Sequence, residues 1–124
     1  MVRQGENTWP NVFRTARFVP AVEHVQMDRL RGVLMEQAHA VMQDLDVLVS
    51  PSFGGGTLGI TNLTGHPCVC LPNALRPVED GPDARRQPGS ISFVAPLYRD
   101  QTALTLAHAV QQETDIHRRR PPIQ

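Results

Sequence analysis

The stretch DVLVSPSFGGGTLGITNLTGHPCVCL, residues 46–71, decides the fold that we expect for this chain. It contains two short apolar runs, residues 47–49 and 68–71, and each ends at or near a proline. Short apolar runs between turn signals are typical of buried strands. The glycine-rich segment between them can adopt positive φ angles or lie close against another group. This segment could face a ligand, or it could only turn the chain between two strands.

The glycines of this segment match the pattern G-x-G-x-x-G over residues 54–59, and Glu79 and Asp80 follow at the distance found in dinucleotide-binding folds. That fingerprint has to open a helix whose N-terminus holds the pyrophosphate. Because Pro67 follows so closely, we expect no full helix here. We therefore predict that the chain binds neither a dinucleotide nor another cofactor.

Helices are predicted on both sides of the central stretch. Apolar residues recur at spacings of three to five over residues 20–44, which indicates a long amphipathic helix. Residues 12–17 fit a turn or a short helix. A further helix is expected over residues 101–113, with Asp100 as its cap. Its inner side would carry Ala103, Leu104, Ala107 and Val110.

In residues 91–95, Ile91, Phe93 and Ala95 alternate with Ser92 and Val94, which predicts a strand with one clearly apolar face. We expect it to pair antiparallel with residues 68–71 across a long loop, residues 73–89, which is rich in proline, glycine and charge. The expected fold is α/β, with a small mixed sheet of about three strands and two flanking helices. The whole chain, residues 1–124, forms a single domain or part of one.

The two predicted strands of the central stretch are apolar on both faces, and such strands are normally covered on both sides. Two helices provide little cover for them. We therefore expect part of the sheet to be covered by another segment of a longer protein or by a second copy of the chain.

The amino-acid composition limits the kinds of molecule that the chain is expected to bind. Twelve basic side chains balance twelve acidic ones, so no net field attracts nucleic acid. No apolar run approaches the roughly 20 residues that span a bilayer, and the N-terminus has no apolar signal segment. These observations predict a cytoplasmic protein that binds neither nucleic acid nor membrane.

The residues alone point to no metal and to no catalytic group. Cys68 and Cys70 would lie on one face of a strand, with Cα atoms about 6.6 Å apart, and we expect two reduced core residues. A metal site needs more ligands than this pair and His66 supply. The sequence also lacks a serine elbow, a P-loop and an H-E-x-x-H helix.

Four segments nevertheless form a recognisable series. They are VEHVQMDRLRGVLMEQ running on to DVLVSPS, then NLTGHPCVCLPN, PGSISFVAPLYRD and ALTLAHAVQQETDIHRRRPP. In this order they resemble the C-terminal end of the amidase signature family, which includes the A subunit of the tRNA-dependent amidotransferases. The similarity extends from about Trp9 to Pro122, and NLTGHP is its most specific segment.

The resemblance implies a hydrolase of C–N amide bonds that works by serine attack, with a Ser–Ser–Lys relay moving protons. Nothing in this chain resembles the serine-rich signature that carries those residues, and the chain contains no lysine. It also has Ala74 and Ala95 where the family tends to have glycine. The implied role is a C-terminal portion that is inactive alone and supplies closing strands and a pocket wall.

The resemblance places the pocket wall at Phe53, Gly54, Gly55, Gly56, Thr61 and Asn62. These residues could instead only hold the turn before His66. The expected partner is the missing N-terminal part of the amidase or a second copy. The alternative is a free-standing, non-catalytic α/β module that binds a ligand or another protein.

Overall fold

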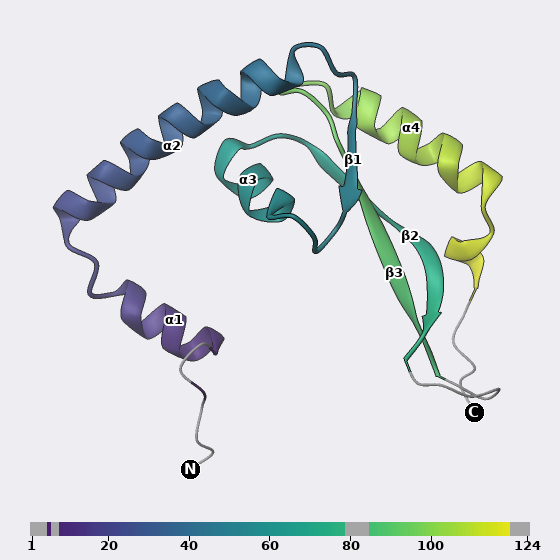
Figure 1. The fold of residues 1–124 in the computed structure, drawn as a ribbon, viewed down its shortest axis with the longest axis horizontal. Coiled ribbons are helices and arrows are strands. Elements are labelled where there is room, and N and C mark those ends of the chain that lie inside the picture. Colours follow the sequence, from purple (N-terminus) through teal and green to yellow (C-terminus); the bar gives the residue numbers. More distant parts are fainter. Residues whose placement is uncertain (1–4, 6–7, 79–84, 120–124) are drawn as a thin grey trace. The chain divides into compact units, whose positions relative to one another are not determined.

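The computed structural model describes residues 5, 8–78 and 85–119 (Figure 1). The chain divides into two units, Met1–Val33 and Leu34–Gln124. The first contains one short helix and the start of a long one. The second contains the rest of that helix, the sheet and the remaining helices, and it holds the candidate site described below.

The first unit confirms both helices predicted before the central stretch. Helix α1 spans Trp9–Ala16, and its Trp9 and Phe13 rings stack one turn apart, with centroids 5.8 Å from each other. Helix α2 spans Ala21–Met42 and begins directly after Pro20. Within the first unit the apolar side chains of α2 are exposed, namely Val22, Val25, Met27, Leu30 and Val33.

The sheet has three strands in the order β1-β3-β2, which confirms the predicted α/β class. The strands are β1 (Leu48–Pro51), β2 (Cys68–Pro77) and β3 (Arg86–Val94), and both pairs are antiparallel. The predicted pairing of residues 68–71 with 91–95 is confirmed, since Cys68 pairs with Val94. Because β1 and β2 both run opposite to β3, they run parallel to each other on its two sides.

The predicted loop over residues 73–89 is largely wrong. Strand β2 continues to Pro77 and β3 begins at Arg86, with one irregularity in the ladder between Pro72 and Ala74. Only β2 and β3 pair in this part of the sheet, so each has an open edge where a proline without an N–H group is tolerated. The remainder of that predicted loop, residues 79–84, lies outside the described residues.

The prediction that no full helix follows the glycines is also wrong. Helix α3 spans Thr57–Thr64 and connects β1 to β2. Gly56 and Gly65 flank it with φ angles of 74° and 80°, in the left-handed region where glycine is favoured. The eight residues between Gly56 and Gly65 leave room for two turns of helix before Pro67.

Helix α4 spans Asp100–Glu113 and contacts β2 and β3, and a short 3-10 helix, Ile116–Arg118, follows it. In Figure 1, α3 and α4 lie on opposite sides of the sheet. The predicted inner face of α4 is confirmed for Ala103 and Ala107 and is wrong for Leu104, which is exposed. Asp100 is the first residue of the helix and makes no capping hydrogen bond, so it is not the cap.

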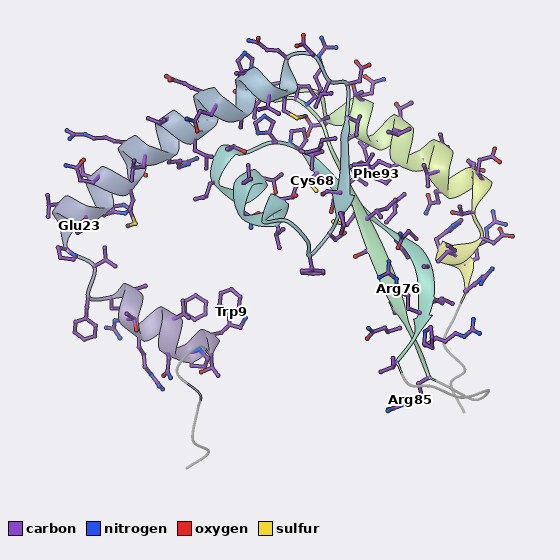
Figure 2. All side chains as sticks on the ribbon, in the orientation of Figure 1. Trp9, Glu23, Cys68, Arg76, Arg85 and Phe93 are labelled. Carbon is purple, nitrogen blue, oxygen red and sulfur yellow. The ribbon has the colours of Figure 1, made fainter. Side chains whose placement is uncertain are left out.

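The core lies along the central strand β3. Its apolar members are Met42, Phe93, Val94, Ala95, Ala103 and Ala107. Ser92, Phe93 and Val94 are consecutive and all buried, so burial here is not limited to the predicted apolar face that carries Phe93. Figure 2 labels Phe93 on the sheet. Both faces of this strand can be buried because α3 and α4 lie on opposite sides of the sheet (Figure 1).

The edge strands are less buried than we predicted. Val49 on β1 is 51% exposed, and Cys68 and Cys70 on β2 are exposed. The two cysteines are reduced, as expected, but they are not core residues of this chain. Across the described segments, no helix is both long enough and apolar enough to cross a membrane.

Candidate functional site

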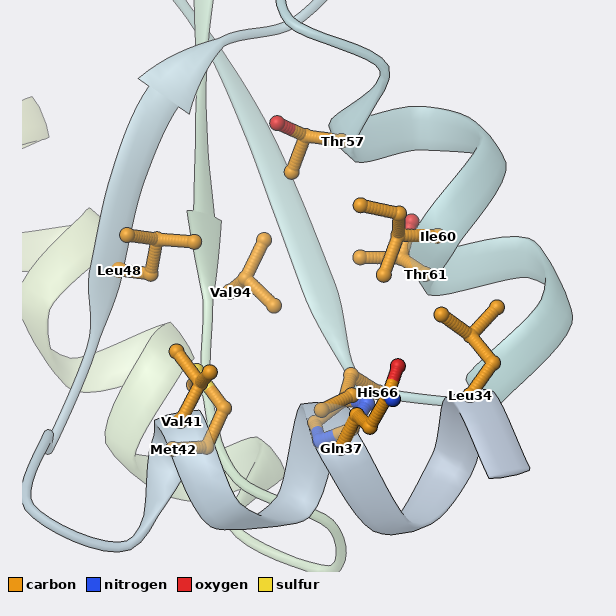
Figure 3. Close-up of a pocket in the computed structure, with 11 residues that line it drawn as sticks. Leu34, Gln37, Val41, Met42, Leu48, Thr57, Ile60, Thr61, His66 and Val94 are labelled. Carbon is orange, nitrogen blue, oxygen red and sulfur yellow. The ribbon is translucent and has the colours of Figure 1, made fainter. Parts of the chain in front are cut away.

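A pocket of about 250 Å³ lies between the C-terminal part of α2, helix α3 and the sheet (Figure 3). Helical spacing explains two of its walls, since residues three or four apart share a face on α2 and again on α3. The sheet provides the third wall through Leu48 and Val94, which are partners in the β1–β3 register. The lining residues are Leu34, Gln37, Ala38, Val41, Met42, Leu48, Thr57, Ile60, Thr61, His66 and Val94.

His66 is the one ionisable side chain in this lining, and it is only 6% exposed. Its Nδ1 atom lies 2.7 Å from the hydroxyl of Thr64, and that hydroxyl donates to the backbone carbonyl of Ile60 at 2.8 Å. A hydroxyl has only one hydrogen to donate, so Thr64 accepts from His66. The hydrogen of the neutral imidazole is therefore on Nδ1, and Nε2 carries a lone pair.

This Nε2 atom is buried and has no hydrogen-bond partner among the described residues. In Figure 3 His66 lies at the end of the pocket nearest α2, opposite Thr57. The hydroxyl of Thr61, another lining group, already donates to the carbonyl of Leu58 at 3.1 Å. His66 Nε2 is thus an unused acceptor in a mostly apolar pocket.

Burial lowers the pKa of His66 below its ordinary value of 6.5, and the nearby His39 on α2 lowers it further. Both effects disfavour the positively charged imidazolium ion. At neutral pH the imidazole is therefore uncharged and keeps its acceptor.

The lowered pKa makes stability depend on pH. Unfolded His66 binds a proton near pH 6.5, whereas folded His66 binds it only at lower pH. The His66 contribution is therefore fully present above pH 6.5, and we expect it to be lost progressively as the pH falls from there through the folded pKa. Urea unfolding between pH 5 and pH 8 measures this loss.

Two variants isolate the His66 contribution to this pH dependence. His66→Phe should remove the part of the decline below pH 6.5 that His66 causes, while His39→Gln, on an exposed position of α2, should keep most of it. Parallel curves of unfolding free energy against pH for the unchanged chain and His66→Phe would contradict the assignment.

A second polar cluster joins β2 and β3 to the turn that directly follows β1. The hydroxyl of Ser92 donates to that of Ser52 at 3.0 Å, and Ser52 donates to the sulfur of Cys70 at 3.7 Å. The Cys70 sulfur lies 3.1 Å from the Ser92 oxygen, which closes a ring of three groups. The hydrogen bond with Ser92 lowers the pKa of Cys70, whereas burial raises the pKa of Cys68.

The six residues predicted to form a pocket wall are not brought together at this pocket. Thr61 lines it, but Phe53 and Gly54 border a separate depression of about 390 Å³ beside β2 and β3. The other three, Gly55, Gly56 and Asn62, are exposed and line neither one. Their role as a wall of a larger active site stays a prediction.

The sequence alone favours a solvent-facing or structural role for His66, and with the two cysteines His66 gives too few ligands for a metal site. Its partner Thr64 lies two residues earlier, on the last turn of α3, so the hydrogen bond depends on a helix that we did not predict. The described segments hold no group of three or more side chains that could bind a metal ion.

Comparison with known proteins finds similarity to amidases. The chain is 28% identical over 125 aligned positions to proteins named "Putative amidase AmiD" from Mycobacterium bovis and Mycobacterium tuberculosis. The alignment covers 83% of this chain and 25% of each relative, so the chain spans about a quarter of the length of the curated relatives that it matches. No family model and no solved structure matches the chain.

Proposed function

We propose that this chain is the C-terminal part of an amidase-like hydrolase that acts on C–N amide bonds. The observation that carries the proposal is its similarity, over most of its length, to one quarter of the mycobacterial relatives named as amidases. The segment NLTGHPCVCLPN, residues 62–73, supports it. This segment forms the end of α3 and the first part of β2, beside the candidate pocket.

The chain would supply the closing strands and part of a pocket wall, and the catalytic residues would lie elsewhere in the protein. All twelve basic side chains of this sequence are arginines. Arginine stays protonated and cannot replace the lysine that a Ser–Ser–Lys relay uses as a base.

The serines of the chain do not form a substitute for this relay. Ser52 and Ser92 are buried; the Ser92 hydroxyl donates to the Ser52 hydroxyl, and the Ser52 hydroxyl donates to the Cys70 sulfur. A nucleophilic serine needs an adjacent base and access to substrate. The cluster is better explained as a polar link that satisfies hydroxyl groups inside the sheet.

The proposal predicts that the isolated chain hydrolyses no amide, because it holds no lysine and no serine-rich signature. Purified protein would be incubated with simple aliphatic and aromatic amides and esters, and release of ammonia or of the acid product would be measured. We expect turnover equal to that of a heat-killed control. Turnover that a single change, such as Ser52→Ala, abolishes would show that the chain has its own catalytic serine.

The same proposal predicts what the gene encodes upstream of this chain. The coding region directly upstream should encode a lysine and a serine-rich signature, in the same frame or an adjacent one. A complete upstream region without such a segment would favour the alternative, a free-standing binding module. The pocket beside His66 is the observation that favours this alternative.

A further inference from the structure

The pocket between α2, α3 and the sheet contains a buried hydrogen-bond acceptor without a partner. Neither a role in completing the sheet nor a role in amide hydrolysis explains this acceptor. Buried polar atoms in proteins almost always have a hydrogen-bond partner. His66 Nε2 is buried and has none among the described residues, although the opposite ring nitrogen is firmly held by Thr64. An oriented acceptor without a partner, on a side chain that lines a cavity, marks the position of a ligand's donor.

The size and walls of the pocket restrict that ligand. An apolar cavity of about 150 Å³ can already hold benzene, and this pocket has about 250 Å³. It therefore has room for one ring with a small substituent. The walls are mainly aliphatic side chains, which disfavour a charged group.

The pocket is also open to entry from solvent. Val41, Leu48 and Ile60 line it and are 65%, 38% and 43% exposed. A ligand can therefore reach His66 without unfolding of the sheet or of α3.

We propose that this pocket binds a small, uncharged, ring-sized apolar molecule that carries one hydrogen-bond donor, and that the donor binds Nε2 of His66. The aliphatic walls bind the ring, and the single acceptor selects for a hydroxyl or an amide N–H. This inference does not rest on the proposed amidase function, and it holds whether or not the chain is part of a hydrolase.

Phenol and toluene test the proposal directly, because they share a ring and differ in the donor. The full chain would be titrated with each at pH 7.5 and followed by NMR of the methyl groups of Leu48 and Val94, which line the pocket and are also present in His66→Phe. We expect saturable binding of phenol, about fivefold tighter than that of toluene, as one net hydrogen bond would give. In His66→Phe this selectivity should disappear.

Two further variants test whether phenol binds in this pocket, even if His66→Phe fails to fold. Ala38 lines the pocket and Ala40 does not, although both lie on α2. Ala38→Leu should fill the space and reduce phenol affinity at least tenfold, whereas Ala40→Leu should leave it unchanged.

Several results would overturn the proposal. They are the absence of saturable phenol binding, equal affinity for phenol and toluene, selectivity that persists in a folded His66→Phe, and phenol binding that survives Ala38→Leu. Equal affinity would indicate a purely apolar cavity of the kind that side chains of another protein segment fill.

Discussion

Replacing Phe93 with alanine is expected to lower the free energy of unfolding by about 3–5 kcal/mol, the usual cost of removing a buried aromatic side chain. Phe93 is 2% exposed on the central strand, where it pairs with Val49 on β1 and with Val69 on β2. It is the one aromatic residue in the small apolar core of the described segments. Since a whole domain is stable by only about 5–15 kcal/mol, this one change should bring the chain close to unfolding.

Phe53→Ala is the matched control for this prediction. Phe53 is 90% exposed, so removing the same ring there should change the unfolding free energy by less than about 0.5 kcal/mol. Urea unfolding followed by circular dichroism measures both variants. Equal effects of the two substitutions would show that β3 is not the centre of the core.

The sequence predicted those elements whose signals are local and repeated. The apolar spacing over residues 20–44 gave α2 to within about two residues at each end, because a long helix repeats its pattern over many turns. The pairing of residues 68–71 with 91–95 was predictable for a similar reason, since both are short apolar runs bounded by turn residues.

Helix α3 was missed because it has only eight residues and its bounds depend on the φ angles of Gly56 and Gly65. Composition does not distinguish a glycine that ends a helix from one that breaks it. The extension of β2 and β3 was missed because residues 73–89, which include Pro77 and Pro88, are rich in proline, glycine and charge and so suggested a loop. Which edge of a strand a proline occupies depends on the neighbouring strands and not on the local sequence.

The candidate pocket could not be predicted from the sequence. Its walls come from segments between residues 34 and 94, and their assembly depends on the strand order. The ring formed by Ser52, Cys70 and Ser92 has the same origin, because it joins β2, β3 and the turn after β1, which are separate segments of the sequence. The one available local signal was His66 itself, placed directly after a threonine and a glycine near the start of a strand.

The exposed apolar side chains of the sheet and of α3 predict that the purified chain self-associates. The edge strands of the sheet expose apolar side chains, among them Leu48 and Val49 on β1, and α3 exposes Leu58 and Leu63. Open edges with apolar side chains pair readily with other chains. We therefore expect the purified chain to self-associate, or to bind a hydrophobic dye while it remains largely folded.

Two valine substitutions test whether association depends on the edge of the sheet or on exposed apolar side chains in general. Val49 and Val78 are 51% and 52% exposed, but Val49 lies in edge strand β1 and Val78 lies just beyond the end of β2. Val49→Lys should reduce association markedly, because a lysine at a strand edge opposes pairing. Val78→Lys should have little effect.

We propose that this chain is part of a larger amidase-like protein, and we infer that part of its sheet is uncovered when the chain is alone. Sedimentation velocity of the purified chain over a range of concentrations, with dye binding and thermal unfolding on the same samples, tests this claim most directly. If this proposal is correct, the samples will contain oligomers whose share rises with concentration, or a monomer that binds the dye. A dilute monomer that binds no dye and unfolds in one sharp cooperative transition would contradict it.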